Sequence, residues 1–255
     1  MGTGGVLVVV SAVVVTLSAC SSSAPPPAAT SSASDSAETS AQAESPAADA
    51  PSESSTPAGD PGAVRYLALG DSLTQGVGAP DEATGAFPAL LAERWRSDGC
   101  TVELRNVGVS GYTARQILDE QVPQIDEFTP TLITFQAGAN DLVNGVTVDE
   151  YRDNVDDILG AASDSGARVI VLAQNEWFRA PSGQGYTTPE ARDEFDAALI
   201  AEAQDHGAEF VDMRSLYKQQ ADENLWVEDG IHPTPEAYQA WADELATRVP
   251  APCRA

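Results

Sequence analysis

The stretch VRYLALGDSL, residues 64–73, is the part of the sequence that decides the fold. Its first seven residues are mainly branched, aromatic or otherwise apolar, which is typical of a buried β-strand. The polar pair Asp71-Ser72 follows directly after a glycine, where a strand of this length should end. A buried strand that runs into a polar turn predicts one unit of a parallel sheet, with a ligand site at the carboxyl edge.

Apolar runs alternate with longer amphipathic stretches through the rest of this part of the chain. We expect strands at Val64–Gly70, Thr101–Val107, Thr131–Ala137, Arg168–Gln174 and Glu209–Met213. We expect helices at Phe87–Ser97, Ala114–Ile125, Val148–Ser163, Pro189–Asp205 and Pro235–Val249. Strands that alternate with helices predict a three-layer α/β/α fold with a central, mostly parallel five-stranded sheet.

Several expected helices have recognisable ends. Thr147 precedes one helix and Glu150 follows three residues later, which is the pattern of a capping box. Thr188 and Thr234 each precede a proline, the residue favoured at the first helical position. Gly207 stands where a helix would end in a left-handed residue.

The chain is strongly acidic, with 39 acidic and 13 basic residues and a formal net charge of −26. All 13 bases lie in residues 63–255, where the net charge is −20. Such a charge repels phosphate backbones and anionic lipids, so we expect no nucleic-acid partner and no electrostatic docking on membranes. Three cysteines without a CxxC pair and two histidines cannot form a Cys/His zinc cluster of the usual spacing.

Residues 1–20 have the pattern of an export signal. Residues 6–17 form a mostly apolar run, which has the length of a signal core and is short for a membrane span. Residues 1–5 contain no Lys or Arg, which is unusual for such a signal. The run ends in Leu17-Ser18-Ala19-Cys20, which resembles the bacterial lipobox and implies that Cys20 carries diacylglycerol. A chance cysteine near an ordinary cleavage site is the alternative.

Residues 21–62 consist mostly of Ser, Ala, Pro, Thr, Asp and Glu, with no aromatic or branched aliphatic residue. Such a segment cannot bury enough apolar surface to offset the entropy lost on ordering, so we expect a disordered acidic tether. Residues 63–255 then form a single domain of ordinary size.

Polar, often glycine-containing segments follow four of the expected strands. The carboxyl ends of parallel strands lie at one edge of the sheet, where one crevice could collect these segments. Nearer the C-terminus, Asp229 and His232 stand three residues apart, a spacing that suits one turn with the carboxylate beside the imidazole. The four segments are Gly70–Gly76, Asn106–Tyr112, Gly138–Asp141 and Asn175–Phe178.

These segments resemble the ordered sequence blocks of the SGNH hydrolases, also called the GDSL family of esterases and lipases. The resemblance extends over residues 66–241, nearly the whole domain. It implies a flavodoxin-like α/β/α fold and a serine hydrolase that uses neither a metal nor a cofactor. The matching residues are Gly70-Asp71-Ser72-Leu73, Gly111, Gly138 to Asp141, and Asp229 to His232.

Serine is a weak nucleophile until a base removes its proton, and the chain has only two histidines to supply that base. We expect His232 to be the base for Ser72, and Asp229 to hold the imidazole Nδ1–H and stabilise the imidazolium. The resemblance implies an oxyanion hole formed by the N–H groups of Ser72 and Gly111 and by the side chain of Asn140. A plain turn glycine at Gly111 and a turn or cap role for Asp229 are the alternatives.

The remaining polar and aromatic residues of interest have less specific patterns. His206 stands at an expected helix end, where an imidazole interacts favourably with the helix dipole, so we expect a structural role. Asp71 and Asp141 are expected to support turns rather than to take part in the chemistry. Trp177 and Phe178 line either the substrate crevice or the core, and both alternatives stay open. The sequence has no GxSxG nucleophile elbow, no P-loop and no complete GxGxxG.

Cys100 and Cys253 remain as an even pair once a lipid occupies Cys20. An exported protein folds in an oxidising compartment, so we expect a disulfide between them, with two separate thiols as the alternative.

Together these features predict an exported serine esterase or lipase that hydrolyses a small ester or acylated substrate through an acyl-enzyme. We expect a monomer without metal or cofactor, lipid-anchored at the outer face of a bacterial cell membrane or secreted. A carbohydrate esterase that removes acetyl groups from glycans is one alternative. A non-catalytic binding module of the cell envelope is the other.

Overall fold

The computed structural model describes residues 62–254. The expected signal, Cys20 and nearly all of the tether lie outside the described residues. None of the helices within residues 62–254 is long and apolar enough to cross a membrane.

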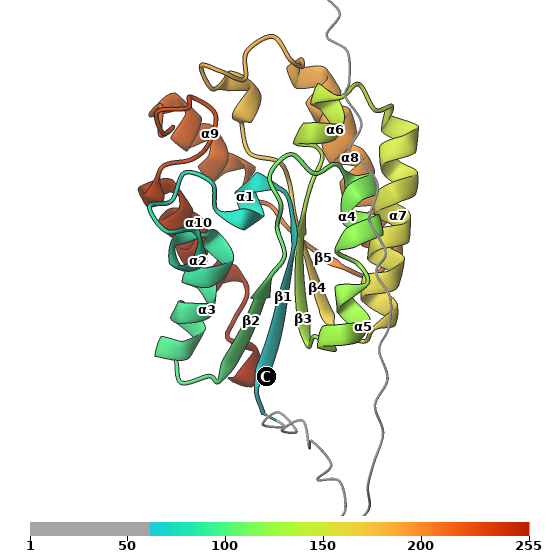
Figure 1. Ribbon diagram of the computed structural model, residues 1–255, viewed down its shortest axis with the longest axis vertical. Coiled ribbons are helices and arrows are strands. Elements are labelled where there is room, and N and C mark those ends of the chain that lie inside the picture. The colour runs from blue at the N-terminus through green and yellow to red at the C-terminus, as the bar shows by residue number, and fades with distance from the viewer. Residues whose placement is uncertain (1–61, 255) are drawn as a thin grey trace, which may run out of the picture. The chain divides into compact units, whose positions relative to one another are not determined.

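A five-stranded sheet, parallel throughout, forms the centre of the domain (Figure 1). The strand order is β2-β1-β3-β4-β5. From β1 the chain first adds β2 on one side of the sheet and then adds β3, β4 and β5 on the other side. In a sheet of this order the switch point at the carboxyl ends of β1 and β3 is where ligands bind. The strands are β1 Val64–Gly70, β2 Val102–Asn106, β3 Leu132–Gln136, β4 Arg168–Leu172 and β5 Glu209–Val211.

Helices cover both faces of the sheet, as the alternation of strands and helices predicted (Figure 1). One layer holds α3 Phe87–Ser97, α9 Arg214–Asp222 and α10 Pro235–Arg248, which pack in one core cluster. The other layer holds α4 Ala114–Glu120, α5 Gln124–Phe128, α7 Val148–Asp164 and α8 Pro189–Asp205, which pack in a second cluster. A second 3₁₀ turn, η2 Pro252–Arg254, ends the described chain. Four short helical elements lie in the connections: α1 Ser72–Gln75, α2 Glu82–Gly85, α6 Ala139–Val143 and the first 3₁₀ turn, η1 Trp177–Arg179.

Strand β1 shows why its sequence is apolar on both sides. Tyr66 and Ala68 belong to the core cluster of α3 and α10, whereas Leu67 and Leu69 belong to the cluster of α4 and α7. Successive side chains of a strand point to opposite faces, and a parallel sheet between two helical layers buries both faces. All four of these residues are fully buried.

The expected helix starts are present, although of the capping box predicted at Thr147 and Glu150 only the hydrogen bond to the Thr147 side chain is found. The side-chain oxygens of Thr147, Thr188 and Thr234 each accept a hydrogen bond from a backbone N–H three residues later, at 3.2, 3.2 and 3.3 Å. Thr113, which the sequence analysis did not single out, forms a complete capping box with Gln116.

One predicted helix, Ala114–Ile125, is wrong in its extent. The structure divides it into α4 and α5, with residues 121–123 between them. Pro123 explains the break, because proline has no N–H for the helical hydrogen bond and its ring clashes with the preceding turn. The break places the buried side chain of Gln121 against the end of β1.

A disulfide joins Cys100 and Cys253, as expected, and links residues 153 positions apart. Cys100 lies just before β2, at the amino ends of the strands, so the bond ties the C-terminal tail to the edge of the sheet opposite the expected site.

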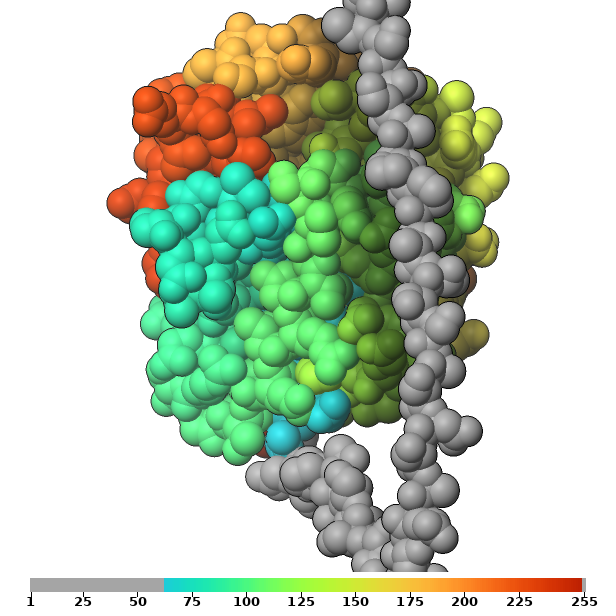
Figure 2. Space-filling model, in the orientation of Figure 1, coloured from blue at the N-terminus to red at the C-terminus, as the bar shows by residue number. Residues whose placement is uncertain are grey.

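At the other end of the domain, segments distant in the chain meet at the surface. Figure 2 shows the residues after β1, in cyan, beside the green residues that follow β2. Two hydrogen bonds join them: Ser110 N–H donates to Gln75 Oε1 at 2.6 Å, and Asn106 Nδ2 donates to Thr74 O at 2.7 Å. The loops after β1 and β2 therefore form one surface at the carboxyl edge of the sheet.

Candidate active site

Ser72 stands at the carboxyl end of β1, as the first residue of α1. Asp71 caps this helix, because its Oδ1 accepts a hydrogen bond from Leu73 N–H at 3.0 Å. The preceding Gly70 is required sterically, since a Cβ there would lie 2.2 Å from Thr74 Oγ1. This turn places the backbone N–H of Ser72 in the first turn of a helix, where it has no partner within the helix.

Gln121 holds the end of β1 from a distant part of the chain. Its Oε1 accepts a hydrogen bond from Gly70 N–H at 2.9 Å, and its Nε2 donates to Gly70 O at 2.8 Å. The side chain is buried, so both bonds are shielded from water. The sequence analysis missed this residue, because no local pattern distinguishes a glutamine whose partner is 51 residues away.

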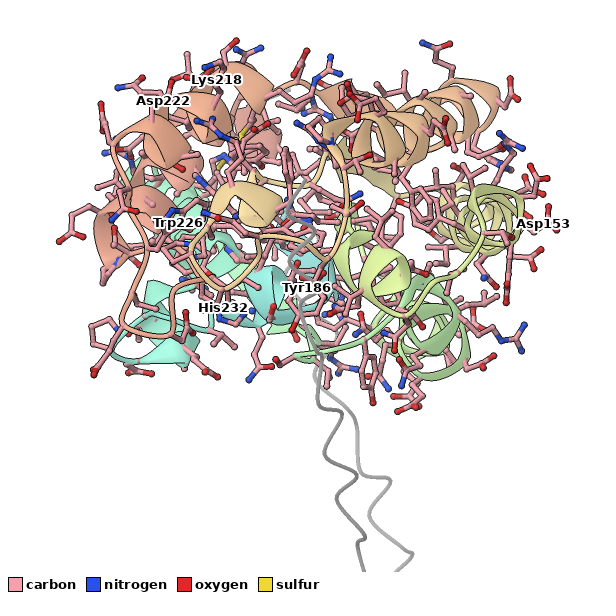
Figure 3. All side chains as sticks on the ribbon, turned by 90° about the horizontal axis from the view of Figure 1, so that it is seen from above. Asp153, Tyr186, Lys218, Asp222, Trp226 and His232 are labelled. Atoms are coloured by element: carbon pink, nitrogen blue, oxygen red, sulfur yellow. A yellow bond between two sulfur atoms is a disulfide. The ribbon has the colours of Figure 1, made fainter. Side chains whose placement is uncertain are left out.

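Asp229 and His232 lie in a loop that an antiparallel bridge between Trp226 and Pro233 closes. His232 Nδ1 is 2.7 Å from Asp229 Oδ2, and His232 N–H donates to Asp229 Oδ1 at 3.0 Å. Figure 3, which looks down on the carboxyl ends of the strands, shows His232 and Trp226 on this face. The three-residue spacing thus produces the carboxylate–imidazole contact that the sequence predicted.

The carboxylate of Asp229 is held in its ionised form. Its partial burial acts to raise its pKa, but hydrogen bonds from the His232 backbone and ring and from Ile231 N–H lower the pKa below its usual value. With Nδ1 facing this carboxylate, Nε2 of His232 is the nitrogen left for proton transfer.

Gly111 and Asn140 line the same pocket as Ser72 and can offer N–H donors to it. Gly111 has a φ of +86°, and a Cβ there would meet no atom within 4 Å, so the backbone is open to a ligand. Asn140 Nδ2 donates to Tyr112 O at 2.9 Å, which orients the amide. Its other contact, to Asp71 Oδ2, is 3.4 Å long, so this N–H is weakly held and can turn to a substrate oxygen.

Ser72, Gly111, Asn140 and His232 line a single pocket with a volume of about 160 Å³. The fold therefore brings Ser72, Gly111 and Asn140 together with His232, which lies more than 90 positions after Asn140 in the sequence. Among the other lining residues only Val143 lies outside the segments that the sequence analysis singled out; these residues are Asp71, Leu73, Ser110, Ala139, Val143, Trp177 and Ile231.

Two buried acids support the loops of this pocket. Burial raises the pKa of Asp71 to about 7, and the charge of Asp141 adds to this effect. Burial likewise raises the pKa of Asp141 to about 6, although its carboxylate accepts a hydrogen bond from Ala114 N–H at 3.1 Å. That bond ties the loop after β3 to the start of α4. Both acids therefore stand in supporting positions, as the sequence analysis expected.

The structure separates Trp177 from Phe178. Trp177 lines the pocket, is 3% exposed and donates from Nε1 to Gln174 Oε1 at 3.0 Å. Phe178 is not among the pocket residues, so its expected place in the crevice is a correction; its ring packs on the Arg192 guanidinium at 5.3 Å. Successive residues of a 3₁₀ turn point about 120° apart, so the two rings of η1 face different neighbours.

His206 lies away from this pocket. It caps the C-terminus of α8, and its Nε2 is 2.6 Å from Asp156 Oδ1 on α7. The structure thus places only one of the two histidines beside Ser72.

A doubly wound α/β domain with a serine, a histidine–aspartate pair and oxyanion donors around one pocket defines the class of serine hydrolases. Residues 68–240 match the GDSL-like Lipase/Acylhydrolase family, and the chain belongs to this family. The protein is a carboxylic ester hydrolase of the SGNH/GDSL type.

Relatives and solved structures agree with this assignment. An arylesterase of Vibrio mimicus is 28% identical over 185 residues, which is 72% of this chain and 86% of the relative. The crystal structure of TesA has a TM-score of 0.61 and 22% identity, and covers 73% of this chain and 98% of its own. Axe2, an acetylxylan esterase from Geobacillus stearothermophilus, has a TM-score of 0.61 and 16% identity. Its alignment covers 73% of this chain and 94% of the Axe2 chain. The two structures show that the fold is shared.

Proposed function

We propose that this protein hydrolyses esters through an acyl-enzyme formed on Ser72, with His232 and Asp229 as its catalytic partners. The observation that carries the proposal is the pocket that Ser72, Gly111, Asn140 and His232 line together, with the Asp229 carboxylate 2.7 Å from His232 Nδ1. These groups come from the ends of β1, β2 and β3 and from the loop before α10.

In the first half of the reaction, Ser72 Oγ attacks the ester carbonyl carbon while His232 Nε2 takes the serine proton. The ionised Asp229 stabilises the imidazolium. The N–H groups of Ser72 and Gly111 and the Asn140 amide donate to the oxyanion of the tetrahedral intermediate. The intermediate collapses, the carbon–oxygen ester bond breaks, and the alcohol leaves with the proton from His232.

In the second half, water replaces the alcohol. His232 takes a proton from water, the hydroxide attacks the acyl carbon, and the same donors stabilise the second oxyanion. Ser72 Oγ leaves with the proton from His232, which regenerates the enzyme and releases the carboxylic acid.

The size of the pocket favours a short acyl or single-ring group. A cavity of about 150 Å³ holds one benzene molecule, and this pocket has a volume of about 160 Å³. Trp177, Val143 and Ile231 supply apolar walls. We therefore propose small neutral esters as substrates, with the larger part of the molecule outside the pocket.

A second candidate, removal of acetyl groups from glycans, is favoured by the same observation. An acetyl group fits this volume, and the acetylxylan esterase Axe2 shares the fold. Hydrolysis rates for acetyl through palmitoyl esters and for acetylated sugars distinguish the two. A preference for acetylated sugars over simple short-chain esters would favour the glycan esterase.

The basic test of the proposal is steady turnover of p-nitrophenyl acetate that a serine-directed organophosphonate abolishes, with the label on Ser72. Absence of turnover by the folded protein would contradict the proposal and support the binding module instead.

The location of the enzyme is a separate part of the proposal. We propose export and anchoring through a diacylated Cys20, with the enzyme acting as a monomer. Two or more acyl chains give stable anchoring, whereas a single chain does not. Labelling cells with a clickable palmitate analogue tests this: the wild-type chain should take up the label and fractionate with membranes. Equal labelling of Cys20→Ser would contradict it.

A further inference from the structure

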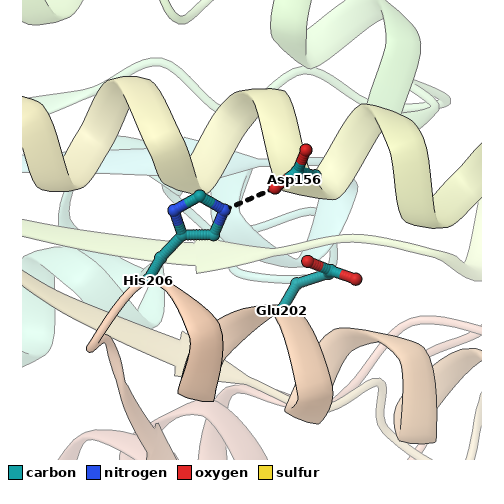
Figure 4. Close-up of side chains that lie close together, drawn as sticks. All are labelled: Asp156, Glu202 and His206. Carbon is teal, nitrogen blue, oxygen red and sulfur yellow. Dashed lines mark hydrogen bonds and ion pairs between the residues drawn. The ribbon is translucent and has the colours of Figure 1, made fainter.

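A cluster of possible metal ligands lies between α7 and α8, outside the pocket. Asp156, Glu202 and His206 each offer one ligand atom, and these atoms all lie within 4.8 Å of one another. Glu202 lies in the last turn of α8, His206 is the C-cap residue of that helix four positions later, and Asp156 comes from α7. Figure 4 shows the three side chains directed into the same space between the two helices.

His206 is held firmly in this position. Its Nε2 is 2.6 Å from Asp156 Oδ1, and its backbone oxygen accepts a hydrogen bond from Ser163 Oγ at 3.0 Å. Its ring lies against Gly160 of α7, where a Cβ would stand 3.4 Å from Cε1. The small residue therefore leaves room for the imidazole beside the helix.

Glu202 provides a second, independent indication of a ligand. The residue is only 9% exposed, and its carboxylate is paired only loosely. Its nearest cationic group is Arg152 Nε at 3.9 Å, which is beyond hydrogen-bond distance, and Arg152 Nη1 is bound to Asp149 at 2.8 Å. A largely buried carboxylate that lacks a close cationic partner is stabilised when an ion binds to it.

We propose that Asp156, Glu202 and His206 bind a divalent transition-metal ion such as Zn²⁺, with water completing the coordination. One imidazole nitrogen and two carboxylate oxygens suit Zn²⁺ and its first-row neighbours, whereas Ca²⁺ and Mg²⁺ prefer oxygen ligands alone. Zinc–ligand bonds of about 2.0–2.2 Å place tetrahedral ligand atoms roughly 3.3 Å apart, so small side-chain movements complete the site.

The site goes beyond the proposed function, because none of its three residues lines the catalytic pocket. The Asp156 side chain is 57% exposed, so an ion can reach the cluster from solvent. A bound ion would join α7 to α8 and stabilise the fold by an amount that rises with the logarithm of the free ion concentration above the Kd.

Calorimetric titration of the purified full chain with Zn²⁺, and visible absorption after addition of Co²⁺, test the site. We expect one ion per chain, and at least about tenfold weaker binding in both Glu202→Gln and His206→Gln. Glu202→Gln keeps the side-chain shape and removes a buried charge, so it should fold even if His206→Gln does not; circular dichroism checks both.

Two matched controls locate the binding. Asp157→Asn changes an exposed acid next to Asp156, and His232→Gln changes the only other histidine. Both should bind Zn²⁺ as the wild type does. The proposal is overturned if the wild type binds no Zn²⁺ at millimolar concentration, if Glu202→Gln binds as tightly as wild type, or if His232→Gln is the variant that loses the ion. Ester turnover is measured separately, so failure of this site leaves the proposed function unaffected.

Discussion

Two histidine–aspartate pairs lie in different regions of this domain, and their contacts are almost equal in length. His232 Nδ1 is 2.7 Å from Asp229, and His206 Nε2 is 2.6 Å from Asp156. The surroundings differ: His232 lines a pocket with Ser72, whereas His206 lies between two helices against Gly160. An imidazole beside a carboxylate therefore does not define a catalytic site; the nucleophile, the oxyanion donors and the pocket do.

The largest predicted effect separates the two histidines. Ser72→Ala and His232→Ala should each lower kcat for p-nitrophenyl acetate by about 10⁴–10⁶-fold, because nucleophile and base act as a unit. His206→Ala should keep near wild-type kcat. Initial rates, with circular dichroism to confirm folding, measure the difference. Near-wild-type activity in a folded His232→Ala would show that His232 is not the base, and the two histidines would then not differ in function.

The two aspartates should show the same contrast as the two histidines, with a loss of kcat only at the residue beside the pocket. Asp229→Ala should lower kcat by about 10³–10⁴-fold, less than loss of His232, because a backbone carbonyl can still orient the ring. Asp156→Ala should leave kcat unchanged.

The pH profile adds a second measure of this pair. Since the pKa of Asp229 is lowered, its carboxylate stays charged at mildly acid pH, so protonation of Asp229 should not limit the wild-type rate there. A rate that falls only at the low pH where Asp229 gains its proton would contradict this.

The next effect tests the donors beside His232. Asn140→Ala should keep the covalent route but lose one oxyanion donor, which lowers kcat by about 10²–10³-fold. Asn154→Ala is the matched control, because Asn154 Nδ2 donates to Glu150 O on α7 and does not line the pocket. KM should change little in either variant, since the bond forms mainly in the transition state. Equal kcat in the two variants would exclude Asn140 from the oxyanion hole.

The sequence predicted the layered fold because the central strands β1 and β3 are buried over nearly their whole length and the long helices α7, α8 and α10 each start at a threonine cap. Val64–Gly70, Phe87–Ser97 and Pro189–Asp205 have the predicted bounds. The helix α9 was missed, because its sequence RSLYKQQAD is polar and, among its residues, only Tyr217 and Gln220 are buried. The short α1 and α6 were also missed, since their formation depends on turns at strand ends rather than on hydrophobic periodicity.

The candidate site was predicted less completely than the fold. Ser72, Gly111 and Asn140 stand in recognisable patterns after strands, and Asp229 and His232 have a recognisable three-residue spacing before α10. Gln121 and Gln174 could not be found in this way, because each is an ordinary glutamine whose role depends on a partner set by the folded chain. The different directions of Trp177 and Phe178 likewise depend on the 3₁₀ geometry of η1, which the sequence did not reveal.

A smaller effect concerns the end of the domain opposite the pocket. Loss of the Cys100–Cys253 bond, as in the double variant with serine at both positions, should lower the free energy of unfolding by about 2–4 kcal/mol. The bond restricts the unfolded chain and lies at the amino ends of the strands, so kcat should not change. Urea unfolding and ester turnover measure the two quantities. If the folded double variant has a lower kcat, the disulfide affects the pocket, and the two ends of the domain are not independent.

The smallest predicted effect concerns the buried acid beside Ser72. Because the pKa of Asp71 is raised from 3.8 to about 7, the folded state keeps this proton up to about pH 7, while the unfolded chain loses it near pH 4. The folded state thus binds more protons in this window, and the free energy of unfolding falls as pH rises through it. Between pH 6 and pH 8 this contribution should fall by about 1.4 kcal/mol.

Urea unfolding of the wild type and Asp71→Asn at both pH values isolates this contribution. The asparagine Oδ1 can still accept the hydrogen bond from Leu73 N–H, so α1 keeps its cap. Asp71→Asn cannot ionise and should lose less stability than the wild type from pH 6 to pH 8. Asp153→Asn, at an exposed position of α7, should follow the wild type (Figure 3). If the wild type and Asp71→Asn lose equal stability, Asp71 does not change its ionisation in the folded state between pH 6 and pH 8, and its pKa beside Ser72 lies outside this range.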